Sequence, residues 1–419
     1  MSAAADIGTD ARGVTATQIE RAALAVVLAI QSGALLPLLA SSDGELDDAA
    51  RAMLRLSVLP VHAVTLILLL RHFRQILTAV RRSWPLVALV TLPMLSVLWS
   101  ISPAISLRRA VALILTLLLS QVLAVMFTPR QLMWTVARVM GICLAGSLAM
   151  MVVDPTLAFT PGETALRGIY INKNVLGWAA ALATVAGAIM ACDVDGRRRG
   201  QGLMLGGLGV VCLVLSHSST SLIAAVAALT FAGFHVLLGR ATGLARTLLM
   251  LSFLVLAGLL LLFLGTLLVP VLDALGKDAT LTGRVPLWHL VDARIAERPW
   301  LGYGYQTFWT EGSSNAWVIW SAIGWQSPHA HNGYRDVLLS VGLAGLVPLA
   351  AVMVQAIRRG ARLSMSYPTG GWLWPNAVLG QSLIINLSES SLLFHNDLQW
   401  ILTAAVITMF AIHARRRPD

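Results

Sequence analysis

Charged residues are scarce in this sequence of 419 residues. Asp, Glu, Lys and Arg make up only 12% of the chain, whereas 57% of it is hydrophobic. A soluble domain needs more polar side chains than this to cover its surface. The apolar stretches are also too long and too uniform for the alternating strands of a membrane β-barrel. The composition therefore predicts an all-α, polytopic membrane protein.

Cysteine is rare as well. The three cysteines, Cys143, Cys192 and Cys212, lie in or at the ends of apolar stretches. This number and placement predict neither a disulfide framework nor a cysteine metal site. The chain also lacks a GxxxxGK[ST] phosphate-binding loop and an HExxH motif, which argues against ATP-driven transport and against zinc-protease chemistry. We expect no cofactor and no metal site.

The net charge of +10 does not indicate a nucleic-acid partner. The arginines fall in short clusters between apolar stretches rather than along one continuous basic surface. Such clusters are typical of the cytoplasmic loops of membrane proteins. They predict an orientation in the membrane, and no nucleic acid is expected to bind.

Twelve apolar stretches approach the length of about 20 residues that a helix needs to cross a bilayer. An even number of spans puts both termini on one side. The arginine-rich loops fall on that same side, which the positive-inside rule makes cytoplasmic. The expected spans are 22–40, 53–70, 84–100, 109–127, 132–153, 175–192, 203–216, 219–238, 247–272, 337–356, 372–388 and 398–414.

This topology divides the chain into five segments. The largest segment outside the membrane is expected to form a partly helical periplasmic loop near the C-terminal third. The segments are a cytoplasmic tail (1–21), transmembrane helices one to nine (22–272), the periplasmic loop subdomain (273–336), transmembrane helices ten to twelve (337–414) and a second cytoplasmic tail (415–419).

Polar residues gather in four loops on the predicted periplasmic side. Polar groups at the membrane are costly to bury, so they are candidates for function. The candidates are Arg167, Lys173 and Asn174 in the first loop, Arg284 in the second, His329, His331, Asn332 and Arg335 in the third, and Glu389 in the fourth.

These residue types suit chemistry on a lipid diphosphate. Guanidinium groups bind phosphate oxygens through paired hydrogen bonds and keep their charge, so Arg167 and Arg284 can clamp a diphosphate. Helix starts just after Asn174 and Arg335 favour the same anion. A histidine such as His331 can take a proton from an attacking hydroxyl. Because diphosphate is a good leaving group, arginines can replace a metal ion.

Each of these residues also has a simpler interpretation. The two arginines can sit at lipid headgroups, His331 can cap a helix, and Glu389 can pair structurally with an arginine. The HAH pair is a weak metal motif without a third ligand. Six of the 13 tryptophans fall in the long outer loop, where they form either an interfacial belt or a platform for sugar rings.

Five stretches, in order along residues 95–400, resemble a known family. They are LWSISPAISLRRA (98–110), RGIYINKNVLG (167–177), SHSSTSL (216–222), LTGRVPLWHLVDARIAERPWLGYGYQTFW (281–309) and SPHAHNGYRDVLLSVGLAGLVPL (327–349). Together they resemble the O-antigen ligase and polysaccharide polymerase superfamily of bacterial inner-membrane glycosyltransferases. The resemblance implies about twelve helices with a large periplasmic loop, and an active site that faces the periplasm.

The resemblance also implies a metal-independent reaction. The donor would be a glycan on undecaprenyl diphosphate, and the acceptor would be a hydroxyl of a saccharide or of lipid A core. Membrane lipid and polysaccharide assembly proteins are the other expected partners. Transport of a lipid-linked oligosaccharide and a non-catalytic scaffold remain alternatives.

Motif matches carry the family's roles to particular residues. Arg167 and Arg284, assisted by Lys173, would bind the diphosphate, and His331 with Asn332 would form the catalytic pair. His217 and Ser219 depart from relatives that carry an arginine in this stretch, and the KN pair at 173–174 favours an exopolysaccharide polymerase over a ligase. Supporting roles would fall to Glu389, His329, Arg335 and Asn174.

Overall fold

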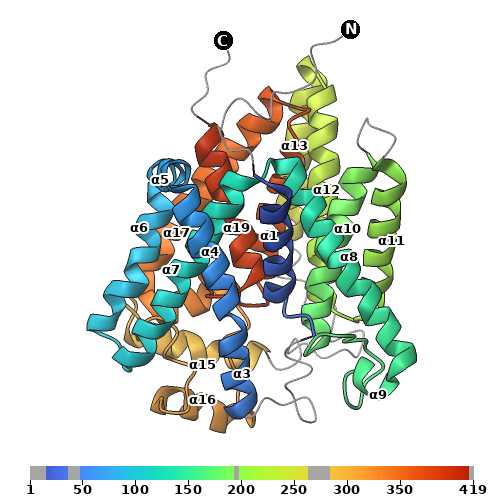
Figure 1. Cartoon of the computed structure of the whole chain (residues 1–419). Helices are drawn as coiled ribbons and strands as arrows, with labels where there is room; N and C mark the ends of the chain where they lie inside the picture. Colours follow the sequence, from blue (N-terminus) through green and yellow to red (C-terminus); the bar gives the residue numbers. More distant parts are fainter. Residues whose placement is uncertain (1–15, 36–47, 193–197, 263–283, 415–419) are drawn as a thin grey trace.

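The computed structural model describes residues 16–35, 48–192, 198–262 and 284–414. Within these ranges the protein is a bundle of helices without a β-sheet (Figure 1). Residues 1–15 and 415–419, which belong to the predicted cytoplasmic tails, lie outside the described residues. So do residues 263–283, where the predicted ninth span ends and the predicted periplasmic loop begins.

Two described segments, 154–172 and 298–332, contain only short helices between longer ones. They are α1 (Gln18–Gln31), α3 (Asp48–Ser57), α4 (Leu59–Arg71), α5 (Phe73–Arg82), α6 (Trp84–Leu95), the short 3-10 helix η1 (Ser96–Leu98), α7 (Pro103–Met126), α8 (Pro129–Val153), α9 (Pro155–Ala158), α10 (Lys173–Ala191), α11 (Arg199–Leu215), α12 (Ser219–Arg240), α13 (Gly243–Leu262), α15 (Arg284–Glu297), α16 (Ser314–Ile323), α17 (Gly333–Ser366), α18 (Leu373–Ile385) and α19 (Leu398–His413).

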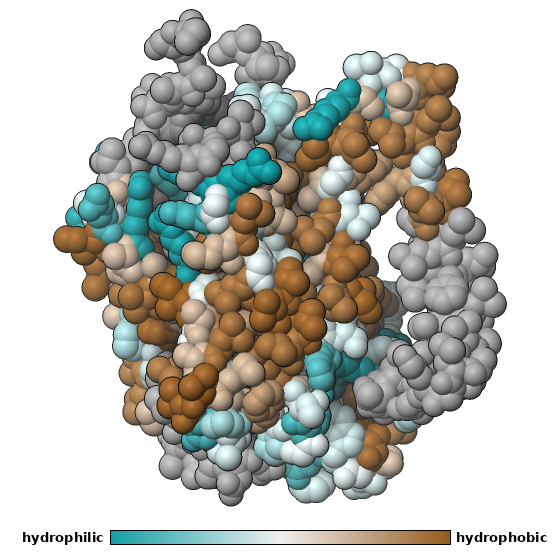
Figure 2. Space-filling model, turned by 90° about the vertical axis from the view of Figure 1, so that its right-hand side faces the viewer, coloured by the Kyte–Doolittle hydropathy of each residue, from teal (hydrophilic) through white to brown (hydrophobic). Residues whose placement is uncertain are grey.

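Among the described residues, six helices are long and apolar enough to cross a membrane: Ala52–Arg71, α7, α8, α10, α12 and α17. Figure 2 shows a broad hydrophobic area across the middle of the face drawn, with hydrophilic side chains above and below it. These features confirm the all-α class and the multi-pass membrane protein. Apolar helices of 10–17 residues occupy further predicted spans, and the count of twelve stays a prediction.

The first apolar stretch differs from its predicted span of 22–40. Helix α1 already ends at Gln31, and Gly33 takes a left-handed conformation with φ of +73°, a usual way to end a helix. The chain then pairs with a distant loop, because the Leu35 amide donates to the Ile169 carbonyl at 2.7 Å. The predicted helix is therefore too long at its C-terminal end, and residues 36–40 lie outside the described part.

Polar side chains fix where the loops become helices at one end of the bundle. Asn172 caps α10 by accepting from the amides of Asn174 and Val175. Asn332 caps α17 and Asp397 caps α19 in the same way. An N-cap side chain satisfies backbone amides that have no partner within the helix. These caps set the start of each helix that follows a loop carrying candidate site residues.

Helices α15 and α16 lie at the lower end of the bundle in Figure 1, beside the start of α17. They share a small apolar cluster that is separate from the main core of the bundle and includes Leu339 of α17. Its buried members are Leu287, Val291, Tyr303, Phe308, Ile319, Ala330 and Leu339. This cluster packs the described part of the long outer loop against the membrane helices.

A kink at Gly342 joins the outer loop to α17 through the backbone. Gly342 has φ of +62° and ψ of −161°, which interrupts the helical hydrogen bonds. The freed Leu339 carbonyl accepts from the Tyr303 amide at 2.7 Å, and the Leu343 amide donates to the Pro299 carbonyl at 2.8 Å. The loop thus supplies the backbone partners that the helix gives up.

Gly342→Ala is expected to destabilise the protein. This backbone conformation is essentially restricted to glycine and costs about 1–3 kcal/mol for other residues. A Cβ atom would also lie 2.3 Å from the carbonyl carbon of Trp300, so the loop would have to move. The measurement is the apparent Tm of the purified full-length variant, which should fall.

Gly207→Ala is the matched control. Gly207 is an exposed residue of α11 with open space around the position of a Cβ atom, and alanine favours a helix by about 0.5–1 kcal/mol over glycine. Its apparent Tm should stay the same or rise. Equal Tm values for the two variants would contradict the importance of the Gly342 kink.

Candidate functional site

Glu389, in the turn after α18, is the centre of the candidate site. Its side chain is buried, with 2% of the residue exposed. Nη2 of Arg284 lies 2.7 Å from Oε1, and Nδ2 of Asn174 donates to the same oxygen at 3.3 Å. Nδ1 of His331 lies 3.4 Å from Oε2. One carboxylate therefore joins α10, α15, the loop before α17 and the turn after α18.

The backbone conformation of His331 helps to aim its ring. His331 has φ of +49°, which is uncommon for a residue with a side chain and recurs at functional sites. Its ring lies against the ring of His329, with centroids 4.2 Å apart, and within 5.8 Å of the Trp325 ring. The backbone amide of His331 donates to Nδ1 of His329 at 3.2 Å. The two histidines thus form one packed unit.

Asn332 acts as a structural connector in this arrangement. Its Oδ1 accepts from the Arg335 amide at 3.1 Å, its Nδ2 donates to the Leu387 carbonyl at 3.0 Å, and its own amide donates to Oγ of Ser390 at 3.2 Å. These bonds tie the start of α17 to the turn that carries Glu389. Asn332, which the sequence predicts to be the catalytic partner of His331, therefore holds these two segments together.

Burial and neighbouring charges decide the protonation of Glu389 and His329. Burial by itself would raise the pKa of the Glu389 carboxyl, but the contacts with His331 and Arg284 outweigh it, so the pKa lies below its usual value of 4.5. Burial lowers the pKa of His329 to about 3, and the neighbouring His331 acts in the same direction. At neutral pH Glu389 is therefore ionised and His329 is neutral.

Arg167 and Lys173 make contacts elsewhere and do not touch the Glu389 cluster. Arg167 has 4% exposure, and its Nε donates to the Leu157 carbonyl at 2.9 Å. Within the described part of the chain, no carboxylate pairs with this guanidinium. A buried charge without a counterion is costly, which makes Arg167 a candidate for holding an anion. Lys173 instead forms an ion pair with Glu163.

The segments that carry Arg167 and Glu389 are connected through the SHSSTSL stretch and the end of α11. The amide of Leu166 donates to the Leu215 carbonyl at 2.8 Å, and Oγ1 of Thr220 lies 2.9 Å from Oγ of Ser388. The segments that carry Arg167 and Glu389 therefore both contact residues close to the turn between α11 and α12.

Arg335 and Asp336, side by side in the first turn of α17, hold the outer loop. Arg335 makes two hydrogen bonds to Asp292, at 2.7 and 2.9 Å, and stacks over the ring of Trp288. Asp336 accepts from Nε1 of Trp309 at 2.8 Å, from the Ala330 amide at 3.0 Å and from Oγ of Ser390. Asp336 thereby fixes the residue between the two histidines, a role that the sequence alone does not indicate.

The cluster also has the composition of a metal site. Ligand atoms of His329, His331 and Glu389 all lie within 4.8 Å of one another, and two histidines with one glutamate form a known zinc ligand set. However, the Arg284 guanidinium already binds the same carboxylate and would repel a cation. The expected absence of a metal stays a prediction.

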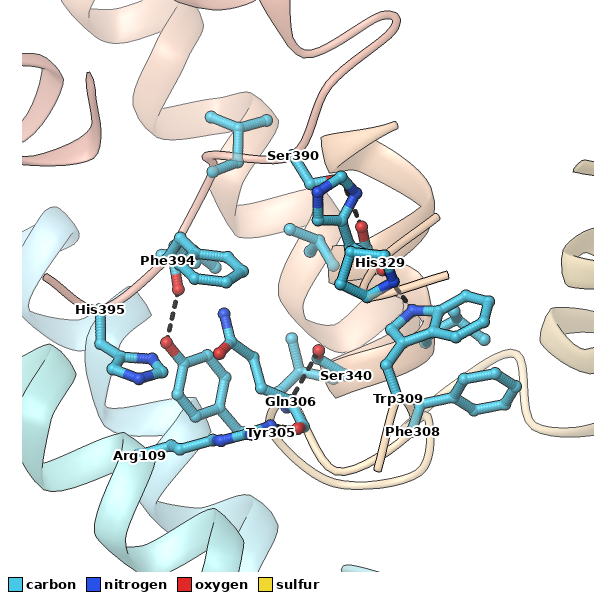
Figure 3. A pocket seen from close by; sticks show the side chains of 17 residues that line it. Arg109, Tyr305, Gln306, Phe308, Trp309, His329, Ser340, Ser390, Phe394 and His395 are labelled. Atoms are coloured by element: carbon cyan, nitrogen blue, oxygen red, sulfur yellow. Dashed lines mark hydrogen bonds between the residues drawn. The ribbon is translucent and has the colours of Figure 1, made fainter. Parts of the chain in front are cut away.

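A cavity of about 220 Å³ borders His329 (Figure 3). Its walls come from α7, the 305–309 segment, the start of α17 and the 390–395 segment. Aromatic, aliphatic and charged side chains line it, among them Tyr305, Phe308, Trp309, Arg109 and Asp336. The candidate site therefore combines the Glu389 cluster with a neighbouring cavity that has aromatic walls.

Two comparisons with known proteins found similar sequences. The O-antigen ligase family matches residues 204–350, which include Arg284 and His331. The chain is also 29% identical over 320 residues to the exopolysaccharide production protein ExoQ of Rhizobium meliloti (strain 1021), an alignment that covers 72% of this chain and 71% of the relative.

One match is to an O-antigen ligase family and the other to an exopolysaccharide production protein. Both support the resemblance of this chain to the O-antigen ligase and polysaccharide polymerase superfamily.

Proposed function

We propose that this protein is a metal-independent glycosyltransferase. It transfers a glycan from an undecaprenyl-diphosphate donor to a sugar hydroxyl at the periplasmic face of the bacterial inner membrane, with both termini in the cytoplasm. The observation that carries the proposal is the convergence of Arg284 and His331 on the buried Glu389. An anion-binding group and a proton acceptor lie together there, as transfer from a diphosphate requires.

Arg284 and Arg167 bind the diphosphate in this proposal. Glu389 engages only Nη2 of Arg284, and a guanidinium has five N–H donors, so donors remain for phosphate oxygens. Arg167 brings a second positive charge that lacks a carboxylate partner among the described residues. Lys173 joins as an outer contact by exchanging Glu163 for a phosphate oxygen. The charge that develops on the leaving diphosphate is then stabilised by fixed cations.

His331 accepts the proton of the acceptor hydroxyl. Nδ1 of His331 faces Glu389, so a proton on Nδ1 leaves the lone pair of Nε2 free. The acceptor oxygen forms a bond to the anomeric carbon, the bond from that carbon to the diphosphate oxygen breaks, and the hydroxyl proton moves to Nε2. The products are the new glycosidic bond and undecaprenyl diphosphate, and Glu389 stabilises the imidazolium.

The supporting residues hold this machinery in place. Asn174 and Arg284 orient Glu389, His329 packs against His331, and Asn332 and Arg335 fix the start of α17.

Glycan transfer is expected to fall at least about 100-fold in each of three variants: Arg284→Ala, Arg167→Ala and His331→Ala. The loss of a charge-stabilising donor or of a general base typically reduces a rate by that much. The measurement is transfer by purified full-length protein in nanodiscs, with lipid-linked donor extracted from cells. Arg294→Ala is the matched control, since Arg294 lies on the same helix as Arg284 but pairs with Glu297 at the surface. Full activity in all three site variants would refute the proposal.

We further propose that the acceptor is another repeat unit, so that the protein is an exopolysaccharide polymerase. The KN pair at 173–174 and the similarity to an exopolysaccharide production protein support this choice, whereas the O-antigen ligase match supports attachment to lipid A core. Purified protein offered both acceptors should lengthen the lipid-linked chain and leave the core unmodified. Glycosylated core would make the protein a ligase.

The same reactions are carried out with and without EDTA. Equal transfer is expected, because arginines supply the positive charge. Loss of transfer with EDTA that a divalent cation restores would instead assign a metal to the His329, His331 and Glu389 cluster.

A further inference from the structure

The cavity beside His329 has a composition that the diphosphate chemistry does not explain. Tyr305, Phe308, Trp309 and Phe394 give it aromatic walls, and its volume is about 220 Å³. Pockets for drug-sized ligands have about 300–1,000 Å³, so this one suits a smaller group such as a single sugar ring. It adjoins the catalytic cluster, because His329 lines it and the His329 ring contacts the His331 ring.

Two polar side chains that line the cavity have no hydrogen-bond partner among the described residues. Nδ1 of His395 is buried and unbonded, and the side-chain amide of Gln306 also lacks a partner. In Figure 3 the amide of the half-buried Gln306 extends between Tyr305 and Phe394, with the His395 ring beside it. A buried polar atom normally has a partner, so a ligand with polar groups would satisfy Nδ1 of His395, and the Gln306 amide lies beside it to bond the same ligand.

The backbone holds Gln306 in position. Gln306 has φ of +52°, a left-handed conformation that is costly for residues other than glycine, asparagine and aspartate. Its amide donates to Oγ of Ser340 at 3.2 Å, and its carbonyl accepts from Nη1 of Arg109. With both backbone groups bonded, the side chain projects from a fixed point on the cavity wall.

We propose that this cavity is a saccharide-binding subsite that holds the acceptor sugar, with Gln306 and His395 recognising its hydroxyl groups. The assignment to the acceptor rests on the glycosyltransferase function proposed above. Aromatic side chains cover the apolar faces of a sugar ring, and an amide both donates to and accepts from hydroxyl groups. In this assignment the donor diphosphate binds at the arginines, and the acceptor sugar binds in the cavity that His329 lines.

The polar groups distinguish a sugar from a lipid chain in this cavity. An acyl chain would leave the buried Nδ1 of His395 without a partner, which is unfavourable, and would make no use of the Gln306 amide. Burial, with help from Arg109 and Arg108, lowers the pKa of His395 to about 3. His395 is therefore a neutral ring with one donor and one acceptor nitrogen, as suits a hydroxyl group.

The test compares saccharide binding by three variants of the full-length protein in nanodiscs. Gln306→Gly removes the amide and tolerates the left-handed backbone. Gln306→Asn also tolerates this backbone and keeps a shorter amide. Gln326→Gly makes the same change at an exposed position of the outer loop. The probe is the free repeat-unit oligosaccharide, released by mild acid from the lipid-linked donor, and calorimetry measures its Kd.

The wild type and Gln326→Gly should bind the oligosaccharide equally. Gln306→Gly should bind at least about tenfold more weakly, as expected for the loss of hydrogen bonds in a buried site, and Gln306→Asn should fall between them. Unchanged affinity in Gln306→Gly, or no saturable binding by the wild type, would overturn the subsite. An unchanged apparent Tm verifies that each variant is folded.

Transfer assays separate this inference from the proposed function. Gln306→Gly should raise the half-saturating concentration of acceptor about tenfold while the value for the donor stays the same. Weaker binding in this variant without any transfer by the wild type would keep the saccharide site and refute the glycosyltransferase. Normal transfer by the wild type, together with an unchanged half-saturating acceptor concentration in Gln306→Gly, would support the glycosyltransferase and refute the saccharide site.

Discussion

The buried carboxylate of Glu389 is the constraint on which the candidate site depends. A carboxylate with 2% exposure cannot stay ionised without partners, and Arg284, Asn174 and His331 supply them from three other segments. Each partner is drawn to the same point, so the carboxylate fixes their mutual distances. A residue that first looks like a structural ion pair thereby sets the geometry of the groups proposed to react.

The kink at Gly342 provides the second constraint, since it brings the outer loop over this cluster. Breaking the helical hydrogen bonds of α17 exposes backbone groups that residues 299–304 then satisfy. The same loop contributes Gln306, Phe308 and Trp309 to the cavity. Asp336 connects the two constraints, because it binds Trp309 of the loop and also Ser390, next to Glu389. The charged cluster and the cavity are thus parts of one connected unit.

The sequence predicts the features that depend on local composition. Apolar length predicts the all-α membrane protein, and charge in otherwise apolar surroundings identifies Arg284, His331 and Glu389, whose contact the structure then reveals. It does not predict features that depend on distant partners. The early end of α1, the bonds of Asn332 and the role of Asp336 all require knowing which loop lies opposite. Gln306 and His395 gain interest only because the fold leaves them unpaired in a cavity.

The charges around His331 suggest why the two halves of the site are arranged in this way. Glu389 contacts both Arg284 and His331, whereas the neighbouring cavity is lined by the neutral rings of His329 and His395 together with Arg109 and Asp336. A departing diphosphate needs fixed cations, and in the proposed reaction Arg284 supplies one of them while Glu389 stabilises the proton that His331 receives. Because His329 is neutral and its ring contacts the His331 ring, it does not oppose that positive charge. A sugar in the proposed subsite would meet the two neutral rings and the two charged side chains.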